Sequence, residues 1–296
     1  MTTQKPSYTA EGVATWRAAG AKEKDESIRN PDFMAMSFLG WKFRLIAGFK
    51  PLTALALRTF QKRVPGGYYF HIARTKHIDA MLAHAIDGDI QQLVILGAGY
   101  DSRPYRFARQ LEGVKVFEVD QPGTQARKKH YLAKTLGGLP DHVVFVDMDF
   151  NAERLDTRLP ESGYDPQKKT FFIWEGVCMY LTPEAAHETL TFIAQHSRPG
   201  SSLVFDYLYR SVIDGTCDYY GARLATSYVA SRGEPYIFGI EEGDSEAFLG
   251  NFGIELESLL GPEELQNAYL MRSDGTLHGR VYAYTDIALG VVAPRD

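Results

Sequence analysis

The sequence predicts an α/β protein with a doubly wound sheet of seven strands and an N-terminal helical cap. From Gln91 onward, short apolar runs rich in Val, Ile and Phe are each followed by loop residues and a helical stretch. Runs of this kind, without polar alternation, are typical of strands buried on both faces of a sheet. Before Gly88 the pattern is helical instead, and Gly and Pro interrupt it. We therefore predict a cap or lid over residues 1–88 and a larger domain over residues 89–296.

Four stretches of the cap have helical patterns: Ala14–Ala21, Phe33–Phe49, Leu52–Arg63 and His71–Asp87. The last is the clearest, because apolar residues recur at helical spacing with polar residues between them. On this pattern alone, Arg74 is expected on the exposed face of the helix. Gly88 then ends the helix.

The segment Leu45–Phe60 comes closest to a membrane segment, but Lys50, Pro51 and Arg58 interrupt it. It cannot supply the roughly 20 apolar residues that a spanning helix needs. A buried or lid-forming helix pair is favoured over contact with a membrane surface.

The predicted strands follow one another along the rest of the chain: Leu93–Leu96, Val114–Val119, Val143–Val146, Phe171–Trp174, Ser202–Phe205, Phe252–Leu260 and Arg280–Val292. Helices are expected between several of them: Pro122–Leu136, Pro183–His196 and Pro262–Tyr269. Thr182 can cap the second of these helices. An insertion at about 207–250 is rich in Tyr and Gly, and its tyrosines either line an aromatic pocket or pack ordinarily: Tyr219, Tyr220, Tyr228 and Tyr236.

The strongest local motif is Leu93–Arg106, LVILGAGYDSRPYR, in which a buried strand ends in Gly97-Ala98-Gly99. Glycine there permits a sharp turn and close approach of a ligand, although a turn without a ligand has the same pattern. A dinucleotide fingerprint requires a third glycine where this chain has Ser102. The carboxylate of Asp101 would repel a pyrophosphate but suits a sulfonium or ammonium cation.

Three later strands also end in acidic residues. Asp120 ends the second strand, where a carboxylate can accept both ribose hydroxyl hydrogens. Asp149-Phe150 follows the third and can bind and cover an adenine, with Asp147 as the competing carboxylate. Glu175-Gly176 ends the fourth strand, where an unpaired buried carboxylate would be costly without a function.

The motifs LGAGYDSRPYR, FEVDQP, DFN and WEGVCMYL, in this order, resemble the leucine carboxyl methyltransferase family. That family includes bacterial and polyketide O-methyltransferases similar to the tetracenomycin carboxyl methyltransferase. The resemblance covers roughly Phe70–Val292 and is weak over the cap. It implies a Rossmann-like class I methyltransferase fold and S-adenosylmethionine as cofactor. It also implies that Arg74 holds the cofactor carboxylate and that Glu175 lies near its amine.

Eleven residues are thus predicted to bind the cofactor: Arg74, Gly97, Ala98, Gly99, Asp101, Asp120, Gln121, Asp149, Phe150, Glu175 and Gly176. The catalytic candidates are weaker, because none has a distinctive spacing: Tyr180, His71, Tyr207 and Arg210. A carboxylate acceptor needs no base, whereas a phenol or enol hydroxyl does.

The resulting hypothesis is an S-adenosylmethionine-dependent O-methyltransferase that methylates a carboxylate, or a phenol or enol hydroxyl, of a small secondary metabolite. One alternative acceptor is a protein C-terminal carboxyl. Alternatives of another class are a nicotinamide-dependent oxidoreductase and a cofactor-binding protein without catalysis.

Net charge, cysteine usage and the N-terminal residues indicate which partners and which cellular compartment to expect. The net charge of -5 gives no reason to expect nucleic acid, and no histidines and carboxylates stand at metal-ligand spacing. Cys178 and Cys217 form no CxxC pattern, and Met1–Ala10 is polar. We expect a cytoplasmic protein without metal or membrane partner; the oligomeric state stays open.

Overall fold

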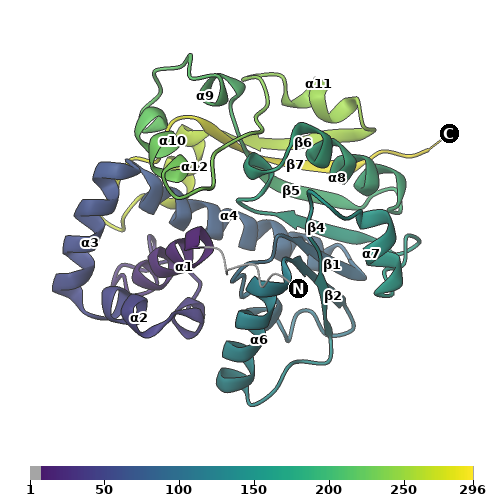
Figure 1. The fold of residues 1–296 in the computed structure, drawn as a ribbon, viewed down its shortest axis with the longest axis horizontal. Helices are drawn as coiled ribbons and strands as arrows, with labels where there is room; N and C mark the ends of the chain where they lie inside the picture. Colours follow the sequence, from purple (N-terminus) through teal and green to yellow (C-terminus); the bar gives the residue numbers. More distant parts are fainter. Residues whose placement is uncertain (1–7, 296) are drawn as a thin grey trace.

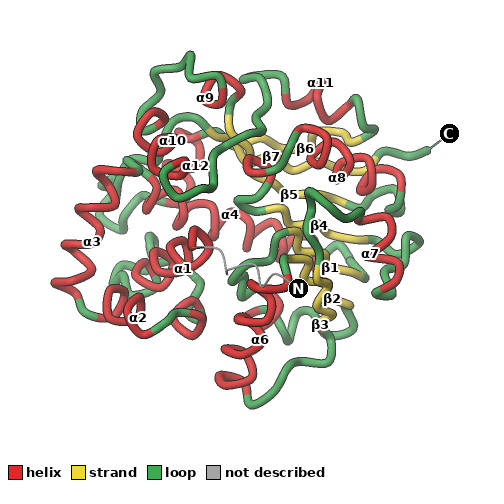
Figure 2. Tube along the Cα trace, in the orientation of Figure 1, coloured by secondary structure: helices red, strands yellow, loops and turns green. Residues whose placement is uncertain are grey.

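The computed structural model describes residues 8–295, so most of Met1–Ala10 lies outside the described part of the chain. A seven-stranded sheet forms its centre, in the order β3-β2-β1-β4-β5-β7-β6 (Figures 1 and 2). The strands are β1 Gln92–Leu96, β2 Lys115–Asp120, β3 Val143–Asp147, β4 Thr170–Trp174, β5 Ser202–Leu208, β6 Ile254–Leu260 and β7 Thr285–Val292. The predicted doubly wound fold is confirmed.

The first five strands are parallel, whereas β7 is antiparallel to both β5 and β6. Every residue of β1 and β4 is buried, while burial alternates along the edge strand β6. This agrees with apolar runs in the centre and one solvent-facing side at the edge. After β3, at one edge of the sheet, the chain crosses back to form β4 beside β1, so the strand order reverses between β1 and β4. In α/β sheets, ligands bind at the point where the strand order reverses.

Helices cover both faces of the sheet, with α7 and α8 in front of it and α4 behind it in Figure 1. The helices after β1 are α5 Arg103–Arg106, α6 Pro122–Leu136, α7 Leu155–Glu161, α8 Pro183–Gln195, α9 Arg210–Ile213, α10 Ala222–Ala230, α11 Ser245–Gly250 and α12 Pro262–Tyr269, with the 3-10 turn η2 Cys178–Tyr180. The predicted cap of α8 is confirmed, since Thr182 Oγ1 accepts a hydrogen bond from the Ala185 N–H at 3.2 Å.

The N-terminal region consists of helices, as predicted, but their bounds differ: α1 Tyr8–Gly20, η1 Ala35–Phe38, α2 Trp41–Gly48, α3 Lys50–Arg63 and α4 Gly67–Asp87. The single helix predicted over Phe33–Phe49 is wrong. The chain forms a 3-10 turn, passes through Gly40 in an extended conformation, and begins the helix α2 at Trp41. The division of the chain at residue 88 stays a prediction.

Leu45–Phe60 does form parts of a helix pair, but the alternative that this pair is buried is wrong, and a lid-forming role stays a prediction. No residue of α3 is buried, and Ala47 is the one buried residue of α2. Among the described residues, no helix is both apolar enough and long enough to cross a membrane.

The strand before the predicted insertion, β5, continues to Leu208 and includes Tyr207. The insertion contains α9, α10 and α11. The last strand starts later than predicted, at Thr285 rather than Arg280. The insertion tyrosines pack against other side chains, as Tyr236 does on Tyr180 with ring centroids 5.4 Å apart.

Candidate active site

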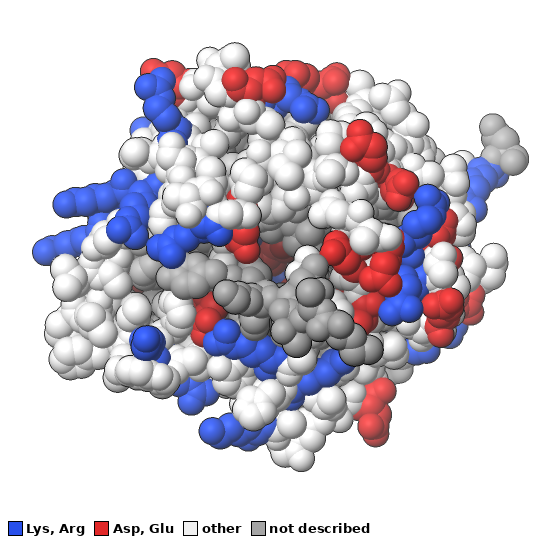
Figure 3. Space-filling view, viewed as in Figure 1, with Lys and Arg blue, Asp and Glu red and all other residues white. Residues whose placement is uncertain are grey.

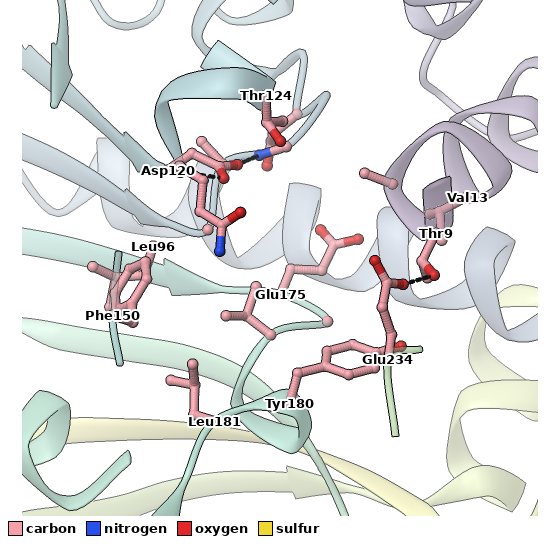
Figure 4. Close-up of a pocket in the computed structure, with 18 of the residues that line it drawn as sticks. Thr9, Val13, Leu96, Asp120, Thr124, Phe150, Glu175, Tyr180, Leu181 and Glu234 are labelled. Atoms are coloured by element: carbon pink, nitrogen blue, oxygen red, sulfur yellow. Dashed lines mark hydrogen bonds between the residues drawn. The ribbon is translucent and has the colours of Figure 1, made fainter. Parts of the chain in front are cut away.

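A cavity of about 380 Å³ opens at the carboxyl ends of β1, β2 and β4. Segments from across the chain form its wall: α1, α4, the ends of the first four strands and the insertion loop at 233–237. All eleven predicted cofactor-binding residues line this one cavity. Figure 4 shows Asp120 at one side, Glu234 at the other and Glu175 between them. The motifs predicted separately therefore form a single site.

The glycine turn after β1 depends on backbone conformations that favour glycine. Gly97 has φ 66° and Gly99 has φ 43°. A Cβ on Gly97 would lie 2.3 Å from Val177 Cγ2, in the loop after β4. The close contact with Val177 therefore excludes any side chain at Gly97, and the backbone at the turn lies open to the cavity.

Asp120 lies directly beneath the turn. Its carboxylate accepts hydrogen bonds from the backbone N–H of Gly99 and from that of Gln121, the latter at 2.6 Å. Burial raises the pKa of Asp120, although these two N–H donors oppose the shift. The contacts hold the carboxylate at the edge of the cavity.

The structure separates the two competing carboxylates after β3. Asp149 and Phe150 line the cavity, whereas Asp147 does not. Asp147 is the last residue of β3, and its Oδ1 lies 3.8 Å from Lys129 Nζ. Asp149 is thus the carboxylate of this strand end that a bound ligand can reach.

Glu175 is held by two buried arginines. Its Oε1 lies 3.0 Å from Arg74 Nε, and its Oε2 lies 2.6 Å from Arg103 Nη1. Burial alone would raise the pKa of Glu175, but the charges of Arg103 and Arg74 outweigh it and hold the pKa below its ordinary value. Glu175 is therefore ionised throughout the neutral pH range.

Arg74 is not on an exposed helix face, as its sequence pattern alone predicted. It is 5% exposed and pairs through Nη1 with Asp206 Oδ2 at 2.6 Å, in addition to Glu175. Asp206 Oδ1 also accepts the Gly176 N–H at 2.6 Å. Arg74 and Asp79 of α4 face buried ion pairs. Hydrophobic periodicity cannot distinguish a polar face of this kind from one that meets solvent.

Arg103 joins the network to α4 and to the glycine turn. Its guanidinium lies 2.6 Å from Asp101 Oδ2 and 2.7 Å from Asp79 Oδ1. Asp79 also pairs with Arg106 Nη1 at 2.6 Å. Because each of these charges has an opposite partner, the sheet edge can bury them.

Of the catalytic candidates, Tyr180 lines the cavity and the other three lie outside its lining. His71 lies on α4, and burial and the Arg74 charge lower its pKa well below the ordinary value. Tyr207 is buried in β5, where its hydroxyl donates to Asp286 Oδ2 at 2.9 Å. Arg210 begins α9. Burial raises the pKa of Tyr180 well above its ordinary value, so its hydroxyl keeps its proton at neutral pH.

Several lining residues were missed by the sequence analysis. The main ones come from α1 and the insertion: Thr9, Val13, Arg17, Glu234, Pro235 and Ile237. Thr9 Oγ1 donates a hydrogen bond to Glu234, which joins the two segments over the cavity (Figure 4). No local pattern reveals a contact between residues 225 positions apart. Asp206 could have been found, because it follows the same rule of a carboxylate near a strand end.

The charges of the cavity fit a cationic ligand. Five carboxylates line it, against two arginines: Asp101, Asp120, Asp149, Glu175, Glu234, Arg17 and Arg74. Partners outside the lining act on both signs: Arg17 Nε lies 3.4 Å from Asp32 Oδ2, and Asp101 and Glu175 share Arg103, so the surplus of carboxylates remains. A sulfonium and an ammonium are attracted to such a surplus, whereas a pyrophosphate is repelled.

The sheet and this site define a class I methyltransferase, a fold whose cofactor site lies at the ends of the first strands. The chain belongs to the leucine carboxyl methyltransferase family, whose model matches residues 10–194. This membership confirms the class predicted from the sequence, an S-adenosylmethionine-dependent methyltransferase.

Two relatives are S-adenosyl-L-methionine-dependent methyltransferases by name. YktD of Bacillus subtilis is 30% identical over 198 residues, which is 67% of this chain and 65% of YktD. SCO7813 of Streptomyces coelicolor is 31% identical over 206 residues, 70% of each chain. The chain thus matches about two thirds of the length of these relatives.

Solved structures support the fold. A protein described as a methyltransferase from Thermobifida fusca aligns over 98% of this chain and 96% of its own, with a TM-score of 0.61 and 13% identity. A DUF574 family protein from Streptomyces avermitilis has a TM-score of 0.62, 13% identity and coverage of 96% and 97%. At this identity the comparison concerns the fold alone.

Proposed function

We propose that this protein transfers the methyl group of S-adenosylmethionine to a hydroxyl oxygen of a small, largely apolar acceptor. The observation that carries the proposal is the convergence of all eleven predicted cofactor residues in one cavity that continues beneath α1 and the insertion loop. When bound, the cofactor supplies a methyl group on a positively charged sulfur, ready for displacement.

The residues that would hold the cofactor follow from their places in the cavity. Asp120 would accept the ribose hydroxyls, and Asp149 with Phe150 would hold the adenine. Glu175, kept ionised by its arginines, would attract the amine. Arg74 would pair with the carboxylate while keeping its contacts to Glu175 and Asp206. Asp120 and Phe150 lie on the side of the cavity away from Glu234, which leaves the Glu234 side for the acceptor.

The presence of a carboxylate side chain at that side favours a hydroxyl acceptor over the carboxylate that the family resemblance implies. Glu234 lines the cavity there, with Thr9, Val13, Tyr180, Pro235 and Ile237 around it. A phenol or enol has a proton to lose, and the Glu234 carboxylate is a group that can accept it, whereas an ionised carboxylate acceptor needs no such group. The O–H of Tyr180 is a donor that could orient the acceptor oxygen.

A paired acceptor screen tests this function. Purified protein is incubated with labelled S-adenosylmethionine and matched phenols and aryl carboxylates of the same ring system. We expect turnover of phenols, with kcat lowered about 100-fold by Glu234→Gln and less affected by Thr9→Val. Turnover of carboxylates alone, unaffected by Glu234→Gln, would overturn the hydroxyl assignment but keep the methyltransferase. Failure to bind S-adenosylmethionine would overturn both.

We also propose the class of acceptor and the cellular compartment in which the reaction takes place. The apolar lining suits an aromatic secondary metabolite, and a protein C-terminus is less suited, because α1 and the insertion loop meet over the cavity. Cys178 and Cys217 are both free thiols, which is consistent with a reducing cytoplasm.

A further inference from the structure

The helix pair α2–α3 carries a large exposed apolar surface that no part of the described chain covers. Trp41, Leu45 and Phe49, spaced four residues apart, are 69%, 53% and 61% exposed, and Leu55 is 62% exposed. Large apolar side chains grouped in this way mark contact sites, whereas single ones need no explanation. We call this the α2–α3 surface and include the basic residues described next.

All charged side chains of the α2–α3 surface are basic. Between Asp32 and Asp79 the sequence has no Asp or Glu, although the whole chain has a net charge of -5. Six exposed basic side chains lie on α2 and α3: Lys42, Arg44, Lys50, Arg58, Lys62 and Arg63. Within the described residues none of the six forms an ion pair, unlike the arginines of the active site. Figure 3 shows blue side chains over α3 and an otherwise white surface around it.

The basic and apolar side chains of α2 and α3 alternate along the exposed surface, as in helices that lie at the interface between water and lipid. Leu55, Arg58 and Lys62 follow one another at helical spacing on the exposed face of α3. Long basic side chains can reach outward to headgroups while their stems and the neighbouring Trp, Phe and Leu side chains enter the acyl boundary. An amphipathic element of this kind lies on a membrane and does not cross it, in agreement with the length of the helices.

We infer that the α2–α3 surface docks this enzyme onto an anionic lipid membrane. Charge complementarity favours lipid over a second copy of the chain. A two-fold symmetric dimer through this surface would bring its six unpaired cations against the same six of the partner. An anionic bilayer offers both negative headgroups and an apolar layer, and it attracts basic clusters beside its surface.

Docking would also bring the active site near the membrane. α1 packs on α2 and contributes Thr9, Val13 and Arg17 to the cavity wall, so it lies between the α2–α3 surface and the site (Figure 1). An apolar acceptor dissolved in the bilayer would then be close to the cavity. The docking itself does not depend on which acceptor is methylated.

Cosedimentation with vesicles tests the inference on the full-length protein. Vesicles of phosphatidylcholine alone are compared with vesicles containing roughly one third phosphatidylglycerol. We expect binding to the anionic vesicles, at least tenfold weaker binding to the neutral ones, and release at about 0.5 M salt.

Two variants separate the apolar and the basic contributions. Trp41→Ser/Leu45→Ser/Phe49→Ser and Lys50→Glu/Arg58→Glu/Lys62→Glu should each weaken binding to anionic vesicles about tenfold or more. The matched control, Leu136→Ser/Leu139→Ser/Leu277→Ser, removes exposed leucines elsewhere and should bind like the parent protein.

Two results would overturn membrane docking. One is the absence of any binding to anionic vesicles by the parent protein. The other is a dimer in analytical ultracentrifugation that the first triple variant dissociates, which would assign the surface to a second copy. Circular dichroism of each variant confirms that it is folded.

Discussion

Two regions of this protein carry many cationic side chains, and they use them in opposite ways. At the sheet edge, Arg74 and Arg103 are buried and each contacts more than one carboxylate. On the α2–α3 surface, Arg58 and Lys62 are exposed and form no ion pair within the described residues. A buried charge depends on its partners, whereas an exposed one is stabilised by water. The difference predicts which substitutions affect folding, cofactor binding or docking.

The largest effect is expected at Arg103, which is fully buried among three carboxylates. Arg103→Met should lower the free energy of unfolding by about 3–5 kcal/mol, because Asp101 and Glu175 lose a buried counter-charge. Urea denaturation measures it. Arg58→Met is the matched control on the exposed surface and should leave the unfolding midpoint unchanged. Equal stability of both variants would contradict the contrast between the two regions.

The next effect concerns cofactor binding at Asp120. Asp120→Ala should raise the Kd for S-adenosylmethionine by roughly tenfold to 100-fold, because a charged hydrogen-bond acceptor is lost. Isothermal titration with S-adenosylmethionine, S-adenosylhomocysteine and NADPH measures this. Asp147→Ala is the control, since that carboxylate ends the neighbouring strand in register with Asp120 but lies outside the cavity lining. Tight NADPH binding by the parent protein would contradict the assigned cofactor.

A smaller effect is expected from pH at His77, a buried group with which no carboxylate among the described residues forms an ion pair. Burial lowers the pKa of His77 from 6.5 to about 4, and its Nδ1 lies 3.0 Å from the Tyr269 hydroxyl. As the pH falls, the unfolded chain binds the proton first, so the contribution of neutral His77 is complete above about pH 6.5 and is lost toward pH 4.

His77→Gln tests this assignment. Between about pH 7.5 and about pH 5, the parent protein should lose about 1–2 kcal/mol more stability than the variant does. Denaturation curves of both proteins at the two pH values give the comparison. An identical loss in both would mean that His77 is not responsible, and that carboxylates of the ion-pair network dominate.

The smallest effect on stability is expected on the α2–α3 surface. Lys50→Gln/Arg58→Gln/Lys62→Gln should shift Tm by no more than about 2 °C and leave turnover of a soluble acceptor unchanged. Differential scanning calorimetry and the labelled-methyl assay measure these. A large loss of stability would show that these residues have structural contacts, and the surface would then no longer contrast with the buried network.

The sheet, the glycine turn and the carboxylates that follow the strands could all be predicted from the amino-acid sequence. These features are local, because a buried strand needs a continuous apolar run and a tight turn needs Gly97. The parallel arrangement then places the strand ends at one edge, so residues from four separate motifs could be assigned to one site. The family was recognisable from the same motifs.

Three features could not be predicted before the fold was known: which polar residues of α4 are buried, which carboxylate after β3 faces the cavity, and which segments cover the site. Helical periodicity shows that one face of α4 is polar but not whether Asp79 and Arg74 meet solvent or buried partners. Thr9 and Glu234 meet through folding of segments far apart in the chain. The exposure of α2 and α3 could not be predicted from the hydrophobic pattern either, because an apolar helix has the same pattern whether it packs in the core or lies on the surface.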